Sequence, residues 1–230
     1  MCIRDRSSFV GYRAAAGSAR RLPGGHRGKC TDAGGEFVVR DARDARGRQG
    51  AMLDGVTVVL ADVRSLYNVG AVLRACDGAG GRRVVACGIT PYPPAGAGDP
   101  RRGPVAARAG RELRKTALAA YDAVAVEHAP DAGAAIERLR REGATVVAVE
   151  NAPGGDSLWR APALDAPRLA LVLGHEVTGL PPDVLARADA TVAVPMLGAG
   201  VSLNVAVAAG VVLYEVVRRR SLPPSLPPSR

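Results

Sequence analysis

The chain has 230 residues, enough for one domain with a buried core, with or without an added segment. It is 47% hydrophobic but only 3% aromatic, with 28 glycines and 17 prolines, which suits a small-residue α/β protein better than a disordered chain. The net charge of +9 is unevenly spread, because residues 1–50 hold 11 Lys/Arg against 5 Asp/Glu while residues 51–230 hold 20 against 17. The body of the chain is therefore only mildly basic, and charge alone does not establish an anionic partner.

Cysteine content and hydropathy indicate the compartment in which the protein is expected to work. The chain contains four cysteines and no CxxC pair: Cys2, Cys30, Cys76 and Cys87. This pattern favours free thiols in a reducing cytoplasm over disulfides or zinc ligands. No secretory signal is recognisable, and the longest apolar stretch, Leu203–Val217, contains Gly210 and Glu215 and is too short to span a bilayer. We therefore expect a cytoplasmic protein without a membrane or metal partner.

Both ends of the chain differ in composition from its middle. Residues 1–50 are rich in Arg, Gly and Ala without strand or helix periodicity, which predicts a mostly disordered basic segment, or alternatively a basic RNA-binding arm. Its opening, MCIRDR, resembles translated adapter sequence, which places the expected native start further downstream, near Met52. The Pro/Ser-rich tail, 220–230, is predicted to be extended chain. We therefore expect residues 51–219 to form the folded domain.

From residue 55 onward, short apolar runs alternate with helical patterns. The expected elements, in chain order, are a strand over Val56–Ala61, a helix over Asn68–Ala79, a strand over Arg83–Ala86, a Pro/Gly loop over 88–110, a short helix over Glu112–Ala119, a strand over Ala123–Val126, a helix over Asp131–Arg141, strands over Thr145–Val149 and Leu169–Leu173, a helix over Pro181–Arg187, a strand over Thr191–Val194 and a helix over Leu203–Arg219. Asn68 is the expected N-cap of the first helix. The second long helix should turn Ile136 and Leu139 inward, and the last should be buried on most sides. This alternation predicts an α/β fold with a mainly parallel sheet covered by helices.

Common nucleotide and catalytic signatures are absent. GGHRGKC has the wrong spacing for a Walker A loop, and Gly78–Gly80 ends a helix rather than joining a strand to one, so the dinucleotide fingerprint fails. His175 and Glu176 begin like HExxH, but the second histidine is missing. A nucleophile elbow, GxSxG, does not occur. A Rossmann-type oxidoreductase is therefore the least favoured of the enzyme classes considered.

Three loop segments remain that could carry chemistry. The first places Asn68, Gly70 and Arg74 at a strand-to-helix junction, where an N-cap and a solvated arginine are the simpler explanation. The second, LVLGHEVTGL, ends a strand in glycine and then offers a carboxylate, and an ordinary tight turn is its alternative. The third, VPMLGAGVSLN, is a glycine-rich loop opening an apolar helix, where Ser/Asn capping is the alternative.

In this order and at these distances, the three segments resemble the three motifs of the SPOUT class of RNA methyltransferases, in its SpoU (TrmH-type) branch. The first motif appears as Asn68, Gly70 and Arg74, the second as LVLGHEVTGL, and the third as VPMLGAGVSLNVAVAAGVVLYE. The segment ELRKTALAAYDAV also resembles the family, with Ala119 where glycine is usual. The resemblance covers roughly residues 55–219.

The resemblance implies a fold and a cofactor. The family has an α/β sheet whose C-terminal part forms a deep trefoil knot, a rare exception to the rule against knotted chains. Its cofactor is S-adenosylmethionine, held bent in the knot mainly by backbone of the second and third motifs. The family forms homodimers in which the last helix usually contributes to the interface.

The resemblance also assigns residues. Arg74 would be the catalytic arginine, and Asn68 would place it or the ribose. The remaining expected site residues divide into those that shape the catalytic pocket, Glu176, Ser202 and Asn204, and those that contact S-adenosylmethionine, Leu173, Gly174, Met196, Leu197, Ser202 and Leu203. Arg101, Arg102 and Arg108 are candidate contacts to RNA phosphates, with a solvated loop as the alternative.

The expected activity is ribose 2′-O-methylation of tRNA or rRNA, with a slight preference for tRNA. In-line attack of a ribose hydroxyl on a sulfonium methyl group depends mainly on positioning and charge stabilisation. Two alternatives stay open: a knotted RNA-binding protein without catalytic activity, and a methyltransferase that acts on a base. The Asn-Gly-Arg motif and the SLN of the third motif favour ribose.

Overall fold

The computed structural model describes residues 31–32, 35–36, 38–40, 53–152 and 154–221. The strands within these residues are β1 (Thr31–Asp32), β2 (Gly35–Glu36), β3 (Val38–Arg40), β4 (Val56–Ala61), β5 (Arg83–Cys87), β6 (Ala125–Ala129), β7 (Thr145–Val149), β8 (Asp156–Ser157), β9 (Leu169–Leu173) and β10 (Ala190–Ala193). Eight of them form one sheet in the order β3-β6-β5-β4-β9-β7-β10-β8, and β1 pairs with β2 separately. Apart from the antiparallel pair β3 and β6, neighbouring strands of the large sheet run parallel, as the sequence predicts.

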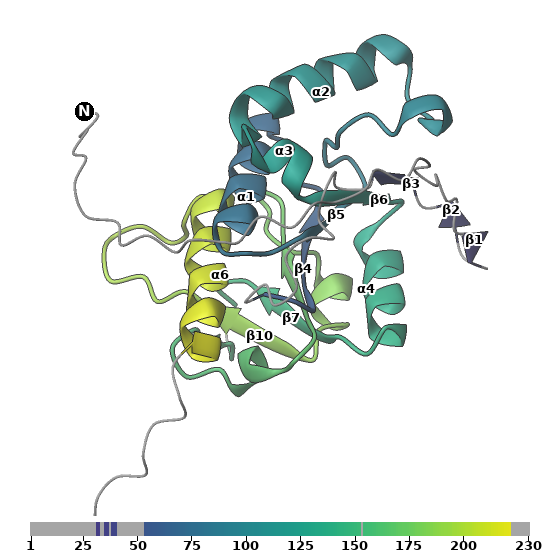
Figure 1. Cartoon of the computed structure of the whole chain (residues 1–230). Coiled ribbons are helices and arrows are strands. Elements are labelled where there is room, and N and C mark those ends of the chain that lie inside the picture. The colour runs from purple at the N-terminus through teal and green to yellow at the C-terminus, as the bar shows by residue number, and fades with distance from the viewer. Residues whose placement is uncertain (1–30, 33–34, 37, 41–52, 153, 222–230) are drawn as a thin grey trace, which may run out of the picture.

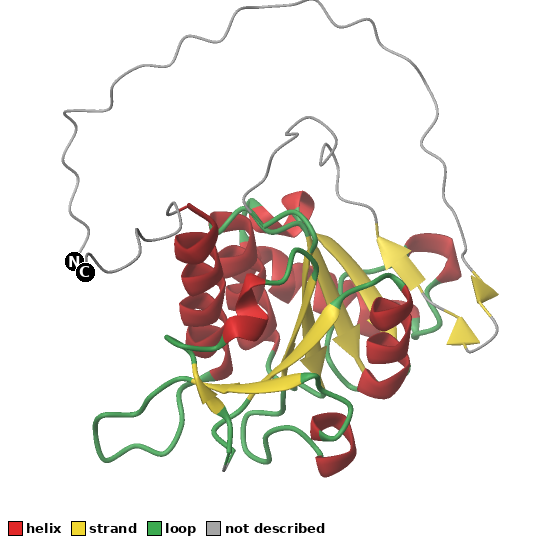
Figure 2. Ribbon diagram, turned by 90° about the horizontal axis from the view of Figure 1, so that it is seen from below, coloured by secondary structure: helices red, strands yellow, loops and turns green. Residues whose placement is uncertain are grey.

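Helices cover both faces of the large sheet (Figures 1 and 2). They are α1 (Leu66–Gly78), α2 (Gly103–Ala117), α3 (Ala120–Ala123), α4 (Ala132–Arg141), α5 (Pro182–Leu185) and α6 (Val205–Ser221), with short 3₁₀ turns η2 (Gly96–Gly98) and η3 (Pro162–Asp165). Side chains of β4 alternate between the two faces, because Leu60 packs with Leu73 of α1 and Leu213 of α6, whereas Val59 packs in the cluster that contains Ile136 of α4. The helical coverage explains why β4 is buried along its whole length.

Most predicted elements are present, and three strands have the predicted bounds: β4, β7 and β9. The prediction that Asn68 caps the first helix is wrong. α1 begins two residues earlier, and the Ser65 side chain accepts the hydrogen bond from the Asn68 backbone N–H. A serine side chain at the N-cap accepts the same kind of backbone hydrogen bond as an asparagine side chain. The Asn68 side chain is therefore available for other contacts.

The predicted loop over 88–110 is partly wrong, because α2 already begins at Gly103. Pro104 is compatible with a first helical turn, where its missing N–H costs nothing. Gly110 lies inside α2 at a close contact, since a Cβ atom there would stand 2.9 Å from Cδ of Pro94. Glycine and proline thus mark a helix start and a packing contact here, not the loop that their frequency predicts.

The prediction that the last helix is buried on most sides is confirmed, because among its described residues only Val207, Tyr214, Arg218 and Ser221 are exposed. Val207 and Tyr214 of α6 are 52% and 53% exposed. The buried positions of α6 include Glu215, whose carboxylate accepts hydrogen bonds from Arg218 and Arg219. The helix therefore packs against the rest of the chain over most of its surface and leaves a narrow strip exposed that includes Val207 and Tyr214.

The ends of the chain fall largely outside the described residues. The short strands β1, β2 and β3 lie within the segment predicted to be mostly disordered, and sequence analysis did not anticipate them. The rest of 1–50 and the tail beyond Ser221 are not described, so the predicted division at these ends stays a prediction. No helix in the described part of the chain is long and apolar enough to cross a membrane.

Candidate active site at the carboxyl edge of the sheet

The loops that carry the three sequence motifs meet at one edge of the sheet. β4, β9, β7 and β10 run parallel and adjacent to one another, so the segments that follow them leave at the same side. The carboxyl edge of a parallel sheet is where α/β proteins usually bind ligands. This register brings residues 62–65, 174–180 and 194–204 together although they lie far apart in the sequence.

Glu176 is the centre of this arrangement. Its carboxylate accepts hydrogen bonds from the backbone N–H groups of Arg64, at 3.1 Å, and Ser65, at 3.0 Å, and from Nδ2 of Asn68, at 3.0 Å. Partial burial alone would raise the pKa of Glu176, but these hydrogen bonds outweigh it and hold the pKa below its ordinary value. Glu176 is therefore an ionised acceptor that holds the start of α1.

Asn204 extends the same hydrogen-bonded chain to the third motif. Its Nδ2 donates to Oδ1 of Asn68 at 3.1 Å, and its own Oδ1 accepts from the backbone N–H of Ala206 at 2.9 Å. Asn204 thus caps the start of α6 and fixes the amide orientation of Asn68 at the same time. Three predicted site residues, one from each motif, are joined as Glu176–Asn68–Asn204.

A cavity of about 330 Å³ opens beside this chain of hydrogen bonds. Its walls come from the ends of β7, β9 and β10 and from the start of α6. Five of the six residues predicted to contact the cofactor line it: Leu173, Gly174, Met196, Ser202 and Leu203. The sixth, Leu197, is 98% exposed and is not among the residues that line the cavity. The contact of Leu197 with the cofactor therefore stays a prediction.

Gly174 is required by a close backbone approach in the second motif. A Cβ atom at this position would lie 2.4 Å from the carbonyl carbon of Gly179. The same turn is closed by His175 N–H donating to Gly179 O at 3.2 Å and Gly179 N–H donating to His175 O at 3.0 Å. Only glycine permits this narrow turn, which forms one wall of the cavity.

Two cavity residues at the end of β7 were missed by sequence reasoning. Glu150 accepts a hydrogen bond from the Leu180 N–H at 2.9 Å, and Asn151 donates through Nδ2 to the Val201 carbonyl at 2.9 Å. They tie the second-motif turn and the third-motif loop to β7. The available signal was their position, since polar residues directly after a buried parallel strand face the same edge as the motifs.

Arg74 and Ser202 are not part of the hydrogen-bonded chain. Ser202 lines the cavity, while Arg74 is exposed on α1 and makes no hydrogen bond or ion pair within the part of the chain that the structure describes. Gly70 of the first motif serves helix packing, because a Cβ there would meet Oγ1 of Thr116 in α2. The first motif therefore combines a site residue, a packing glycine and an exposed arginine.

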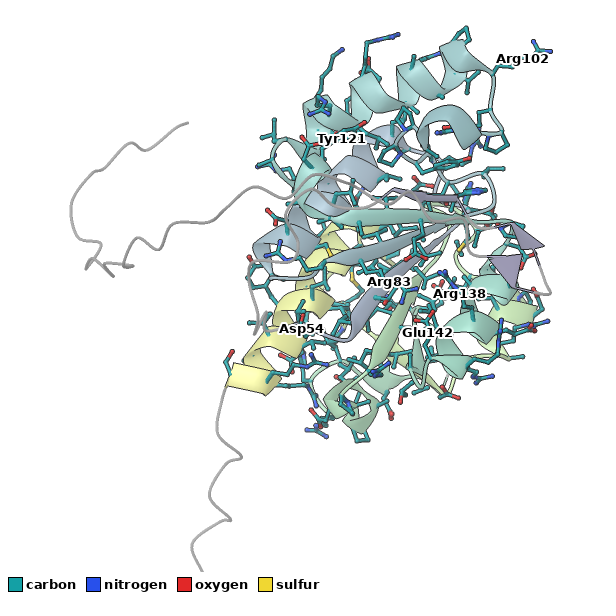
Figure 3. All side chains as sticks on the ribbon, turned by 45° about the vertical axis from the view of Figure 1, so that its right-hand side comes forward. Asp54, Arg83, Arg102, Tyr121, Arg138 and Glu142 are labelled. Carbon is teal, nitrogen blue, oxygen red and sulfur yellow. The ribbon has the colours of Figure 1, made fainter. Side chains whose placement is uncertain are left out.

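The three arginines predicted to contact RNA differ in their surroundings. The Arg101 guanidinium donates to the Asp99 carboxylate and to the carbonyl groups of Tyr92 and Pro93, and its contact with an RNA phosphate stays a prediction. Arg102 projects into solvent from the start of α2 (Figure 3), and Arg108 is exposed on the same helix. Among the described residues, no cluster of three or more His, Cys, Asp or Glu side chains is arranged to hold a metal ion.

Fold and site together define an α/β protein with a ligand cavity built from loops at the carboxyl edge of a parallel sheet. Residues 103–214 match the SpoU rRNA Methylase family. The chain is 32% identical over 188 residues to the 23S rRNA (guanosine-2′-O-)-methyltransferase RlmB of Xylella fastidiosa, covering 81% of this chain and 66% of that protein, just under two thirds of its length. It is 30% identical over 165 residues to the tRNA (guanosine(18)-2′-O)-methyltransferase of Thermus thermophilus, covering 72% of this chain and 75% of that protein.

A solved structure of a related protein has a similar fold. A putative RNA methyltransferase of the TrmH family from Porphyromonas gingivalis superposes with a TM-score of 0.59 at 27% identity, covering 72% of this chain and 60% of that one. The chain belongs to the SpoU (TrmH-type) family of the SPOUT superfamily. The trefoil knot that this family is expected to have is consistent with the strand order and stays a prediction.

Proposed function

We propose that the protein transfers a methyl group from S-adenosylmethionine to a ribose 2′-hydroxyl of tRNA or rRNA. The observation that carries the proposal is the hydrogen-bonded chain Glu176–Asn68–Asn204 beside a ligand-sized cavity. These hydrogen bonds join one residue from each of the three motif segments. The names of the relatives, which are 2′-O-methyltransferases of 23S rRNA and of tRNA, support the same reaction. A cytoplasmic location is the setting that such a substrate implies.

The cavity suits S-adenosylmethionine in size and in the character of its walls. Leu173, Met196 and Leu203 supply apolar surface for the adenine ring, while Glu150 and Glu176 bring carboxylates to the rim. When bound, the cofactor supplies an electrophilic methyl group on a cationic sulfonium. These carboxylates complement that positive charge, so the residues present fit the cofactor.

The residues of this chain supply positioning and charge stabilisation. Glu176 holds the Asn68 amide in one orientation, and Asn68 is placed to orient a ribose beside the cavity. A guanidinium gives up its proton only with difficulty, which makes arginine a demanding base. We therefore assign Arg74 the role of orienting the hydroxyl and stabilising the alkoxide that develops on its oxygen.

The exposed apolar face of α6 supports a homodimer. It presents Val207 and Tyr214, and an apolar helix face of this kind is normally covered by another protein surface. A Cβ at Gly78 of α1 would lie 3.1 Å from the Tyr214 hydroxyl, so α1 borders this face. Arg74 lies one helical turn before Gly78. A second copy on this face would therefore cover or border Arg74.

Methyl transfer to RNA tests the proposal. The purified protein is incubated with bulk RNA and S-adenosylmethionine carrying a radiolabelled methyl group, and the RNA is then hydrolysed with alkali. A 2′-O-methyl group blocks cleavage at its own nucleotide, so label in alkali-resistant dinucleotides is the expected result. Label in mononucleotides would show base methylation, and cofactor binding without transfer would show a protein that lacks catalytic activity.

A further inference from the structure

A second cavity lies at the same edge of the sheet, on the other side of β4. Its volume is about 500 Å³, which is enough for a ligand of nucleotide size. It is lined by the segment after β5, the start of α2, the end of β6 and Leu66 at the start of α1. No residue of the three family motifs lines it, and Leu66 lies just before the first motif.

One wall of the second cavity is a stack of three planar groups. The Tyr92 and His128 rings are 4.2 Å apart between centroids with an interplanar angle of 23°. The Arg101 guanidinium lies 3.5 Å from the centroid of the Tyr92 ring. Since two planar groups at these distances cannot share one ring face, Arg101 and His128 enclose Tyr92 between them. All three members of the stack line the second cavity.

Hydrogen bonds hold Arg101 and His128, the two end members of the stack, in place. Asp99 accepts hydrogen bonds from Nε and Nη2 of Arg101, and this pairing holds the pKa of Asp99 at about 2. His128 Nε2 is 3.0 Å from the Gly88 carbonyl. With its charge neutralised by Asp99, Arg101 offers a flat surface rather than a free cation.

Apart from Thr90, the rest of the lining is apolar or positively charged. Ile89 and Val105 are 63% and 55% exposed, which is high for aliphatic side chains at a cavity mouth. Arg108 lies at the rim, and the described residues that line the cavity include no carboxylate. An occupant with a flat aromatic part and a nearby negative charge matches this combination, as a nucleotide within RNA does.

The second cavity is linked to the candidate active site through the end of β4. Thr90, in the cavity wall, accepts a hydrogen bond from the Val63 N–H at 3.0 Å. The next residue, Arg64, donates its backbone N–H to Glu176. A ligand in the second cavity is therefore separated from the Glu176–Asn68 pair only by the short segment 62–66.

We propose that this second cavity binds an unpaired base of the RNA substrate, next to the ribose that accepts the methyl group. The inference rests on the proposed function for the identity of the RNA as substrate. The base stacks on an end member of the Arg101–Tyr92–His128 stack, and Ile89 and Val105 lie at its edge. Arg108 receives the adjoining phosphate.

Val105→Asp tests the site, with Ala107→Asp as its matched control. Both positions are exposed on α2 and both variants add one negative charge, but only Val105 lines the cavity. We expect Val105→Asp to raise the KM for RNA by about tenfold, because stacking of one base contributes strongly to single-strand binding. The affinity for S-adenosylmethionine, measured by calorimetry, should stay unchanged in both variants. Should Val105→Asp fail to fold, Ile89→Ser in the exposed loop gives the same test.

Photocrosslinking supplies a readout that does not require turnover. Bulk RNA containing 4-thiouridine, or 6-thioguanosine in a parallel sample, is irradiated with the protein and the labelled tryptic peptides are identified. Crosslinks on the peptides 84–101 and 103–108, lost in Val105→Asp and kept in Ala107→Asp, are the expected result. Equal KM values for the two variants, or crosslinks confined to other peptides, would overturn the base site. Crosslinks at these peptides without any methyl transfer by the wild type would instead refute the proposed function alone.

Discussion

Glu176→Gln is the substitution that most directly perturbs the candidate active site without changing its shape. The carboxylate accepts three hydrogen bonds, two at Oε1 from Ser65 and Asn68 and one at Oε2 from Arg64. A glutamine oxygen can replace Oε1, but its NH₂ group then faces the Arg64 N–H as a second donor. One bond is lost and the other two change from charge-assisted to neutral.

The magnitude follows from typical hydrogen-bond energies. Bonds to charged groups contribute about 1.5–3 kcal/mol and neutral ones about 0.5–1.5 kcal/mol, and the partial exposure of Glu176 favours the lower end. We expect Glu176→Gln to lower the free energy of unfolding by about 2 kcal/mol, or the Tm by about 4–8 °C for a domain of this size. Hydrogen exchange at the Arg64 and Ser65 amides should accelerate by about tenfold or more.

The assay combines thermal unfolding, hydrogen exchange and methyl transfer, with Glu137→Gln as control. Glu137 pairs with Arg187 on the surface, so its substitution should change stability by no more than about 0.5 kcal/mol. Because the folded pKa of Glu176 is lowered, its contribution is full above the ordinary value of 4.5 and is lost as pH falls through the folded value. The variant should lack this acid-dependent loss. Equal stability and equal exchange at Arg64 in wild type and Glu176→Gln would show that the Glu176 carboxylate does not hold the start of α1.

Three further predictions follow from the packing. Gly174→Ala places a Cβ 2.4 Å from backbone of Gly179, so we expect the turn to open and calorimetry to show at least about tenfold weaker binding of S-adenosylmethionine; unchanged affinity would contradict the assigned cavity. Gly70→Ala places a Cβ 1.8 Å from Oγ1 of Thr116, which should destabilise the α1–α2 contact by about 1–3 kcal/mol in urea unfolding; a stability equal to that of the wild type would contradict this. Burial raises the pKa of the Cys76 thiol to about 12 and also raises the pKa of the Cys87 thiol. We therefore expect neither thiol to be alkylated by iodoacetamide at neutral pH in the native protein. Labelling of either cysteine, detected by mass spectrometry, would contradict their burial.

The parts of the fold that sequence analysis predicted well are those with strong local patterns. β4, β7 and β9 are short apolar runs ended by polar residues or glycine, and their bounds were predicted correctly. The start of α2 was missed because Gly103 and Pro104 are typical of a loop until their place in a first helical turn is known. Strands β1 and β2, of two residues each, carry too little periodicity to be recognised.

The candidate site was predictable where residues belong to a motif and unpredictable where they depend on strand order. Asn68, Glu176 and Asn204 were singled out by the resemblance, but their mutual hydrogen bonds follow from β4 lying beside β9. Glu150 belongs to no motif, and its place in the cavity depends on β7 pairing with β9. Long-range register of this kind cannot be read from local patterns.

The exposed environment of Arg74 was likewise not predictable from its motif. Sequence spacing shows that Asn68 and Arg74 do not share one face of a helix, but it does not show which face is covered. In the structure Asn68 turns toward Glu176 while Arg74 stays at the surface. Catalysis by Arg74 therefore requires that substrate or a second copy of the chain come to it.

Arg74→Ala, assayed for methyl transfer and cofactor binding in parallel, tests whether Arg74 acts in the transfer step. We predict that transfer of the methyl group to RNA falls by at least about a hundredfold, since removal of one charge-stabilising donor has effects of that order. The Kd for S-adenosylmethionine should stay within about twofold of the wild-type value, because Arg74 does not line the cavity. Full transfer activity in Arg74→Ala, or a loss of cofactor binding that accounts for the lost activity, would show that Arg74 does not stabilise the transfer step.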